Sequence, residues 1–200
     1  MYDRDTLTFY ETSETTYRAS GRGGVSRHLD AFLDLLPKGA RILELGCGGG
    51  TDAAEMIARG FDVDPTDGSA AIASIAAERL GRPVRVMRFD ELAVEQVYDA
   101  VWASAALLHV PRVALPNILN RVHRSLKPGG LHHASFKAKG VEQRDTDGRY
   151  FNHLNEVDLR AAYLACASPW DIIETTSYEG GGYPDGTRGP WVSILARRPL

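Results

Sequence analysis

The apolar positions of the 200-residue chain follow two alternating spacings. Short apolar runs of the kind that form buried strands occur at residues 41–45, 61–66, 84–87, 99–103, 131–136, 171–177 and 191–197. Apolar residues at helical spacing occur at residues 24–36, 51–59, 69–80, 112–126 and 156–166. Strands that alternate with helices in this way predict an α/β fold with a parallel sheet. The run from Ala100 to Ala103 is continuously apolar, which predicts a strand covered by helices on both faces.

Two connections between these elements are long. Residues 137–155 are mostly polar, and residues 179–189 contain five glycines and Pro184. Long connections in compact domains are commonly binding loops or lids. We therefore expect such loops at these two places.

A glycine-rich turn follows the first predicted strand. The strand reaches Glu44, then Gly46, Gly48 and Gly50 alternate with other residues, and a helical stretch begins near Asp52. Glycine permits positive φ and lets a ligand approach the backbone, and the start of a helix offers free N–H groups to an anion. Strand, glycine turn and helix together predict the nucleotide-binding arrangement of a doubly wound sheet. A strained turn without a ligand is the alternative.

The spacing of the glycines bears on which nucleotide would bind. The dinucleotide fingerprint requires its third glycine at the position where this chain has Thr51. The form Glu-x-Gly-x-Gly-x-Gly, from Glu44 to Gly50, instead resembles motif I of class I S-adenosylmethionine (SAM) methyltransferases.

An acidic residue follows the second predicted strand. Asp67 lies about twenty residues past the glycine turn, where an acid commonly meets the ribose hydroxyls of a nucleotide. Asp64 is the competing candidate, but Pro65 follows it, and Asp67 is nearer the helix that starts at Ser69. Asp67 could also act as an acid that stabilises the N-terminus of that helix, and the two roles can coexist.

The composition excludes several other classes of protein. A net charge of −3 and a pI near 6.1 argue against a nucleic-acid groove, which usually needs a basic face. The polar N-terminus shows no signal peptide, and no apolar run is long enough to span a membrane. Cys47 and Cys166 are too few for a disulfide framework. We expect a reduced, cytoplasmic protein that binds neither nucleic acid nor membrane.

Further motifs extend the resemblance to most of the chain. They are the segments 41–45, Asp67-Gly68-Ser69, 98–103, Leu107-Leu108-His109-Val110-Pro111 and Leu126-Lys127-Pro128-Gly129-Gly130. This series resembles bacterial class I methyltransferases. Residues 98–111, with Ala134-Ser135-Phe136-Lys137 and Arg149-Tyr150-Phe151-Asn152, are similar to the subgroup labelled tellurite-resistance-related. The resemblance implies a Rossmann-like, seven-stranded, mostly parallel sheet in the order 3-2-1-4-5-7-6, with strand 7 antiparallel and helices on both faces.

The resemblance also implies a set of cofactor-binding residues. Glu44 would steady the turn and lie near the methionine amino group, and Asp67 with Gly68 would hold the ribose. Phe89, Asp90 and Glu91 would bracket the adenine, with either acid available to its exocyclic amine. The remaining candidates are Tyr17, Gly46, Cys47, Gly48 and Asp52 around the turn, and Ala103 and Ser104 at the end of the fourth strand.

Histidine is the candidate for acid–base chemistry. His109 follows the fourth strand at the cofactor-facing edge, and an imidazole has a suitable pKa for a general base. Bracing a nearby loop is the alternative role. His132 and His133 are adjacent on a strand, so they should point to opposite faces. No cluster of histidine, cysteine and acidic residues has metal-ligand spacing, so no metal is expected.

The function that best fits these patterns is methyl transfer from SAM to a small-molecule nucleophile. A non-catalytic SAM-binding regulator and, less favoured, an NAD-dependent oxidoreductase are the alternatives. We expect residues 1–38 to form a helical cap, of which residues 2–20 act as a mobile lid with Tyr10 and Tyr17 over the ligand. Plain packing of these two tyrosines within a capping helix is the alternative. Residues 39–200 would form the SAM-binding domain. The acceptor and the oligomeric state are not readable from the sequence.

Overall fold

The computed structural model describes residues 2–13, 17, 24–182 and 187–200. Its main sheet has seven strands. In spatial order they are β3 (Arg85–Val86), β2 (Asp62–Asp67), β1 (Arg41–Leu45), β4 (Tyr98–Ala103), β5 (Leu126–Lys137), β9 (Gly189–Arg197) and β8 (Asp171–Gly180). β9 is antiparallel to both neighbours, and the pairs from β3 to β5 are parallel. The predicted order and the antiparallel seventh strand are confirmed, since β6 (Glu142–Arg144) and β7 (Tyr150–Asn152) form a separate hairpin.

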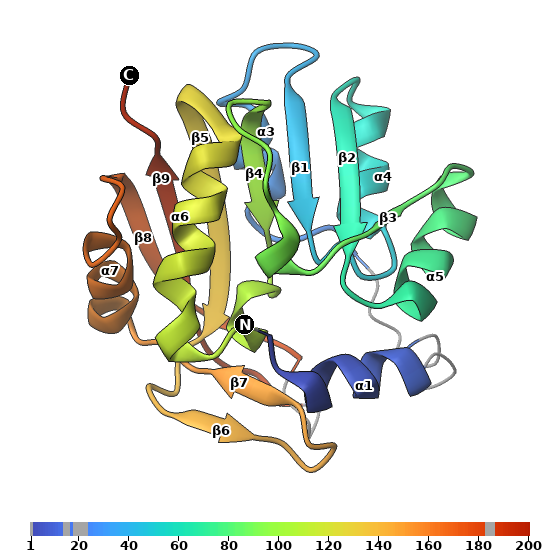
Figure 1. The fold of residues 1–200 in the computed structure, drawn as a ribbon, viewed down its shortest axis with the longest axis vertical. Coiled ribbons are helices and arrows are strands. Elements are labelled where there is room, and N and C mark those ends of the chain that lie inside the picture. Colours follow the sequence, from blue (N-terminus) through green and yellow to red (C-terminus); the bar gives the residue numbers. More distant parts are fainter. Residues whose placement is uncertain (1, 14–16, 18–23, 183–186) are drawn as a thin grey trace.

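Helices cover both faces of this sheet (Figure 1). The described helices are α1 (Arg4–Thr12), α3 (Leu29–Leu33), α4 (Thr51–Ala58), α5 (Ala70–Leu80), α6 (Leu115–Ser125) and α7 (Glu156–Leu164). Short 3₁₀ turns lie at Phe89–Glu91, Leu107–His109 and Arg112–Ala114. In Figure 1, α6 lies in front of the sheet, while α3 and α4 lie behind it.

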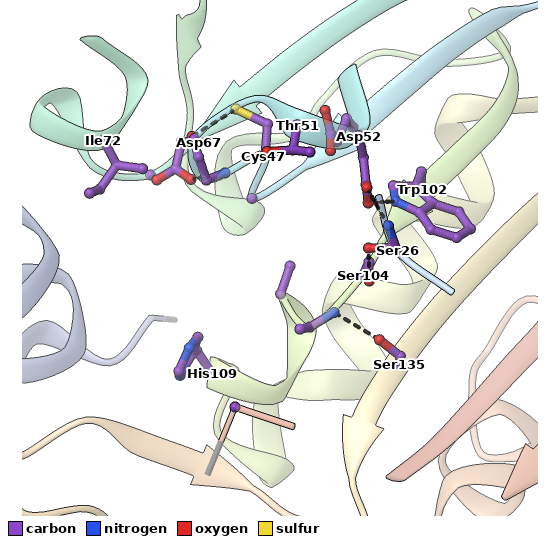
Figure 2. Close-up of a pocket in the computed structure, with 18 of the residues that line it drawn as sticks. Ser26, Cys47, Thr51, Asp52, Asp67, Ile72, Trp102, Ser104, His109 and Ser135 are labelled. Carbon is purple, nitrogen blue, oxygen red and sulfur yellow. Dashed lines mark hydrogen bonds between the residues drawn. The ribbon is translucent and has the colours of Figure 1, made fainter. Parts of the chain in front are cut away.

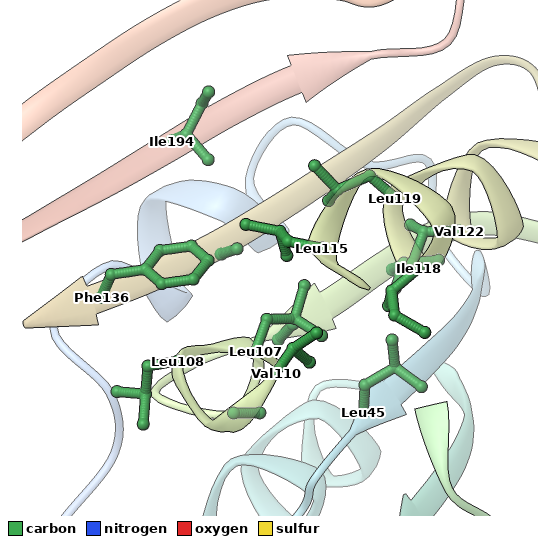
Figure 3. Close-up of a cluster of buried hydrophobic side chains, with 14 of the residues drawn as sticks. Leu45, Leu107, Leu108, Val110, Leu115, Ile118, Leu119, Val122, Phe136 and Ile194 are labelled. Carbon is green, nitrogen blue, oxygen red and sulfur yellow. The ribbon is translucent and has the colours of Figure 1, made fainter. Parts of the chain in front are cut away.

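Alternate residues of the central strands pack into two different apolar clusters. Leu43 of β1 and Val101 of β4 join the cluster that includes Leu115 and Ile118 of α6 (Figure 3). Ile42 and Trp102, each one residue away along its strand, join the cluster on the opposite face, which includes Phe32 of α3 and Met56 of α4. Successive side chains of a strand point to opposite faces, so burial of both sets explains why the strands read as continuously apolar.

The two adjacent histidines of β5 follow the same rule. The ring of His132 lies 5.9 Å from Tyr163 of α7, whereas the ring of His133 stacks 4.2 Å from Trp102 on the face covered by α3. The prediction that they point to opposite faces is confirmed, and Trp102 lies in the core, as a residue inside a strand should.

Two predicted segments differ from the structure. The helix expected over residues 24–36 is reduced to α3, because Gly24 has φ +107° and the backbone N–H of Ser26 donates to the Asp52 carboxylate at 2.8 Å. The loop expected over residues 137–155 contains the β6–β7 hairpin. Its strands have three residues each, too few to give a recognisable apolar pattern in the sequence. The hairpin is tied to the sheet by the N–H of Leu154, which donates to the Lys137 carbonyl.

The carboxyl ends of the parallel strands face α1 and the β6–β7 hairpin (Figure 1). Asp3 caps α1 by accepting from the N–H of Thr6 at 2.9 Å. Glu11 accepts from the N–H of Ala70 at 2.7 Å, and Thr6 accepts from the N–H of Tyr150 at 2.8 Å. These bonds hold α1 across the strand ends, where it closes one side of a cavity of about 720 Å³.

Candidate functional site

The glycine turn forms one wall of this cavity. Gly46, Gly48 and Gly50 all adopt positive φ, between +54° and +76°. A Cβ at Gly46 would lie 2.7 Å from the Cβ of Ala106, so only glycine fits there. The N–H of Cys47 donates to the carbonyl of Thr66 at 2.8 Å, which ties the turn to the end of β2. Gly46, Cys47 and Gly48 all line the cavity, as predicted for residues that meet a cofactor.

Asp67 braces the same turn from β2. Its carboxylate accepts from the N–H of Gly48 at 3.1 Å and from the N–H of Ser69 at 3.0 Å (Figure 2). Burial raises the pKa of Asp67 to about 6, although these two backbone bonds oppose the shift. Ser69, not Asp67, caps α5 through its hydroxyl and the N–H of Ile72. Asp67 therefore joins the glycine turn to the start of α5, and its predicted bond to a ribose stays a prediction.

The competing acid is occupied elsewhere. Asp64 accepts from Arg85 at 2.7 Å and from the hydroxyl of Tyr98. It is not among the residues that line the cavity, whereas Asp67 and Gly68 are. Since Asp64 already serves this network within the sheet, the structure favours Asp67 of the two.

Glu44 is the most unusual group at the site. Its side chain is buried, and no described residue donates to its Oε2 atom. Burial raises the pKa of this carboxyl well above its usual range, and the nearby carboxylates of Asp52 and Asp67 add to the shift. A buried carboxylate without a donor costs free energy. An ammonium group at this wall of the cavity would supply the missing donor and favour the ionised form.

Asp52 already has partners for both carboxylate oxygens. One accepts from the N–H of Ser26 and the other from the indole N–H of Trp102, both at 2.8 Å (Figure 2). Asp52 lines the cavity at the start of α4, yet its bonds join three segments of the protein. Its predicted contact with a cofactor stays a prediction.

The residues predicted for adenine divide into two groups. Phe89 and Asp90 line the cavity, but Glu91 does not. Glu91 instead accepts from the backbone N–H of Arg88 at 2.8 Å and pairs with its guanidinium. Asp90 is therefore the better placed of the two acids, although it also pairs with Arg88 at 3.3 Å.

The two residues predicted at the end of β4 also differ. Ser104 lines the cavity, and its hydroxyl lies 2.9 Å from the hydroxyl of Ser26 (Figure 2). Ala103 does not line it, because its side chain is fully buried in the apolar cluster below. The strand alternation places only every second side chain of β4 toward this face.

His109 lies at the cavity with both ring nitrogens near a partner. Its Nδ1 is 2.8 Å from the carbonyl oxygen of Tyr150, and its Nε2 is 3.0 Å from the hydroxyl of Tyr10. A carbonyl can only accept, so Nδ1 carries the proton and donates. In the neutral ring, Nε2 then accepts from Tyr10, which leaves Nε2 as the basic atom on the cavity side. This geometry suits the predicted general base.

The N-terminal segment reaches the glycine turn through Tyr17. The hydroxyl of Tyr17 accepts from the N–H of Gly49 at 2.9 Å. Tyr10 and Tyr17 both line the cavity, and their rings lie 6.3 Å apart. Of the predicted lid, residues 14–16 and 18–20 lie outside the described part of the chain.

Several lining residues were missed by the sequence patterns. They come from residues 24–28, from β5 and from the β8–β9 pair: Arg27, His28, His133, Ser135, Tyr178, Arg188 and Trp191. Only the glycine-rich stretch after residue 179 marked this region in the sequence. The residues converge because β9 runs antiparallel between β5 and β8, which brings segments far apart in sequence to one sheet edge.

Among the described residues, no group of three or more histidines, cysteines and acids is arranged to hold a metal ion. Within the same residues, no helix has the length and apolarity needed to cross a membrane.

Comparisons with known proteins agree with this geometry. Residues 42–130 match the model of a family described as a methyltransferase domain. A trans-aconitate 2-methyltransferase of Variovorax paradoxus (strain S110) is 35% identical over 164 residues, which cover 75% of this chain and 56% of that relative. A ubiquinone biosynthesis O-methyltransferase of Xanthomonas oryzae pv. oryzae (strain PXO99A) is 34% identical over 110 residues, which cover 52% and 44%. The chain spans about half the length of these curated relatives.

A solved structure shows the same fold over almost the whole chain. The magnesium protoporphyrin IX methyltransferase of Synechocystis PCC 6803 with bound S-adenosylhomocysteine has a TM-score of 0.72 at 17% identity, and the match covers 98% of this chain and 100% of that one. The main sheet and its helices therefore form a Rossmann-like methyltransferase fold. The comparisons thus show similarity to methyltransferases in sequence and in fold, and they do not single out the tellurite-resistance-related subgroup.

Proposed function

We propose that this protein transfers a methyl group from SAM to a small-molecule nucleophile held in the same cavity. The observation that carries the proposal is the buried Glu44 carboxylate, which lacks a donor beside a glycine turn with three positive φ angles. An amino acid ammonium group supplies that donor. A nicotinamide dinucleotide has no aliphatic ammonium group to satisfy Glu44.

The chain's own residues supply the contacts that SAM requires. Glu44 would accept from the methionine ammonium, and the backbone of Gly46 and Gly48 would lie against the methionyl part. Asp67 would accept from the ribose hydroxyls. Because burial raises the pKa of Asp67, these two donors would stabilise its ionised carboxylate. Phe89 would cover one face of the adenine. When bound, SAM supplies an electrophilic methyl group on a sulfonium centre.

Orientation and proton removal would be the protein's contribution to the reaction. The strand ends and α1 enclose the reactants, so that the nucleophile can be held in line with the methyl group. His109 would take the proton of a hydroxyl acceptor on Nε2, because Nδ1–H is held by the carbonyl of Tyr150. Tyr10 occupies Nε2 in this structure and would have to yield that position to the acceptor.

The names of the relatives support a small acceptor. The two curated relatives are named for trans-aconitate and for ubiquinone biosynthesis, both of which concern small molecules. Assignment to the tellurite-resistance-related subgroup and a location in the cytoplasm are also part of the proposal. The subgroup rests on the sequence resemblance, and the location rests on the two cysteines, which are too few for a disulfide framework.

The N-terminal helix α1 would act as a lid over the bound cofactor. It lies across the strand ends, and its bonds to the body of the protein include those from Glu11 and Thr6 to backbone N–H groups. Tyr10 and Tyr17 line the cavity from this side. The division into a cap, residues 1–38, and a SAM-binding domain, residues 39–200, remains part of this proposal.

Calorimetry followed by a transfer assay tests the function. We expect S-adenosylhomocysteine and SAM to bind and NAD not to bind, and we expect label from methyl-labelled SAM to reach a component of a small-metabolite extract. NAD binding without SAM binding would overturn the proposal. Tight SAM binding without transfer to any component would support a non-catalytic SAM-binding regulator instead.

A further inference from the structure

The two ends of the cavity carry different charges. The end formed by β1, β2 and their loops contributes the carboxylates of Glu44, Asp52 and Asp67. The opposite end is formed by residues 24–28 and by β5, β8 and β9. The described lining residues of that end include two arginines and two histidines but no carboxylate. A cofactor with a cationic centre suits the first end, and the second end needs a different ligand.

The two arginines converge on one neutral oxygen. A guanidinium nitrogen of Arg188 lies 2.6 Å from the carbonyl oxygen of Glu179, and one of Arg27 lies 3.4 Å from the same atom. Arg27 also lies over the ring of Tyr178, 5.1 Å from its centroid. Among the described residues, no carboxylate pairs with either guanidinium. Each retains N–H donors beyond the shared carbonyl, and like charges brought together favour an anion between them.

A buried imidazole without partners faces the same end. His133 is 5% exposed, and no described residue bonds to its Nδ1 or its Nε2. Burial lowers the pKa of His133 well below its usual range, so the ring is neutral. A neutral imidazole offers one donor and one acceptor. A polar ligand atom at this end would satisfy at least one of them.

Flat aromatic surfaces complete this end. The rings of Tyr178 and Trp191 are nearly parallel, with an interplanar angle of 17° and centroids 6.3 Å apart. Trp191 lies directly against Gly180, where a Cβ would come within 2.5 Å of the indole. The indole N–H donates to the carbonyl of Gly181 at 3.0 Å, which fixes its plane. Such rigid flat walls favour a planar ligand.

We propose that the methyl acceptor is a planar carboxylate whose anionic group binds Arg27 and Arg188 and whose polar substituent reaches His133. This inference rests on the proposed function, because it treats the cavity as shared between SAM and an acceptor. It assigns the acceptor end to residues that no sequence pattern marked. A carboxylate can form two parallel hydrogen bonds with a planar guanidinium group. The arginines would therefore recognise both the negative charge and the planar shape of the ligand.

Titration with a matched pair of probes tests the acceptor class. The probes are 4-hydroxycinnamate and its neutral amide, added to the protein with and without saturating S-adenosylhomocysteine. Nuclear magnetic resonance would follow the side-chain N–H signals of Arg27 and Arg188 and the ring nitrogens of His133. We expect the carboxylate to bind at least about tenfold more tightly than the amide and to shift all three sets of signals.

Substitution of each arginine tests whether Arg27 and Arg188 cause the preference for the carboxylate over the amide. We expect Arg27→Gln and Arg188→Gln each to remove most of the advantage of the carboxylate and to leave binding of the amide nearly unchanged. Arg197→Gln is the matched control, because Arg197 is an exposed arginine at the other end of β9. It should keep the full preference.

Several outcomes would overturn the acceptor class. They are equal affinity for acid and amide, absence of binding by both, an unchanged preference in both arginine variants, and a response to phenyl phosphate without a response to the carboxylate. Loss of S-adenosylhomocysteine binding in the calorimeter would instead overturn the proposed function. Because the titration is also run without S-adenosylhomocysteine, the two failures are distinguishable.

Discussion

The two ends of the cavity are built in different ways. The end proposed for the cofactor, called the cofactor end below, is a short, continuous stretch from Glu44 to Asp52, braced by Asp67 from the next strand. The end proposed for the acceptor, called the acceptor end below, is assembled from four segments, with Arg27 and Tyr178 separated by about 150 residues of chain. The first end uses backbone geometry and carboxylates, whereas the second uses arginines, histidines and aromatic rings.

This difference matches two different tasks, which are binding a cofactor and selecting an acceptor. Binding one cofactor requires a fixed turn, and the positive φ angles at Gly46, Gly48 and Gly50 restrict the sequence there. The acceptor end has no comparable backbone requirement, apart from the close approach of Trp191 to Gly180. The side chains at this end can therefore differ between proteins that bind different acceptors. Five experiments would break or sharpen this contrast.

Substitution of His109 should have the largest effect, and it should act on turnover alone. If His109 is the general base, His109→Gln should lower turnover on a hydroxyl acceptor by about 10²–10⁴ with little change in SAM affinity. The acceptor would be the one found with labelled SAM, and calorimetry would measure the affinity. A pH–rate profile should also lose its limb near the imidazole pKa. Full activity in a stable His109→Gln protein would contradict the base role.

Substitution of Gly46 should instead act on the cofactor end. Gly46→Ala adds a Cβ at φ +68° that would meet Ala106 at 2.7 Å, so the turn must shift. We expect S-adenosylhomocysteine affinity to fall on the order of a hundredfold, since strain and displacement each cost about 1–3 kcal/mol. Gly60→Ala is the matched control, with φ +87° and no atom within 4 Å. Equal affinity in both variants would show that the turn does not position the cofactor.

Asp67 and Asp64 form the next matched pair. Asp67→Ala should lower S-adenosylhomocysteine affinity at least about tenfold, because charge-assisted bonds are worth about 1.5–3 kcal/mol each. Asp64→Ala should leave the affinity nearly unchanged but lower the free energy of unfolding, because it removes the partner of Arg85 and Tyr98. Calorimetry and urea unfolding measure the two quantities. The reverse pattern would assign the ribose role to Asp64.

The raised pKa of Asp67 predicts a pH dependence of stability. The folded protein holds this proton up to about pH 6, against 3.8 for the ordinary carboxyl. The resulting stabilisation is fully present below pH 3.8 and is lost as the pH rises through 6. Between pH 7 and pH 4.5, wild type should therefore gain roughly 1–2 kcal/mol relative to Asp67→Asn. Urea unfolding of the ligand-free proteins measures it, and parallel pH profiles would refute it.

The smallest expected effect is on the exchange of the α1 amides. If α1 is a lid, hydrogen exchange within Arg4–Thr12 should slow several-fold when S-adenosylhomocysteine saturates the protein. The amides of α7, which is remote from the cavity, serve as the internal control. Equal exchange in α1 with and without the ligand would remove the lid from the mechanism.

The sequence alone determined the fold class and the glycine turn that forms one wall of the cavity. A central strand that is buried on both faces requires a continuous apolar run, and a turn with positive φ angles requires glycines at alternate positions. Both patterns can be recognised in the sequence. The helix expected over residues 24–36 was too long, because the contact of Ser26 with Asp52 is tertiary. Whether Ala103 or Glu91 reaches the cavity was likewise not readable, since strand facing and the contact with Arg88 decide it.

Only the tertiary structure decided which residues form the end of the cavity that we propose for the acceptor. Arg27, His133 and Arg188 lie in segments whose local patterns indicate a helix, a buried strand and a loop, and nothing in those patterns links them. They meet because β9 inserts antiparallel between β5 and β8 and because the bonds of Ser26 to Asp52 and Ser104 hold residues 24–28 at the same strand ends. The physical reason is that a backbone turn depends on residues adjacent in the sequence. The partners of a charged side chain such as Arg27 or Arg188 are instead residues distant in the sequence, and only the folded chain brings them together.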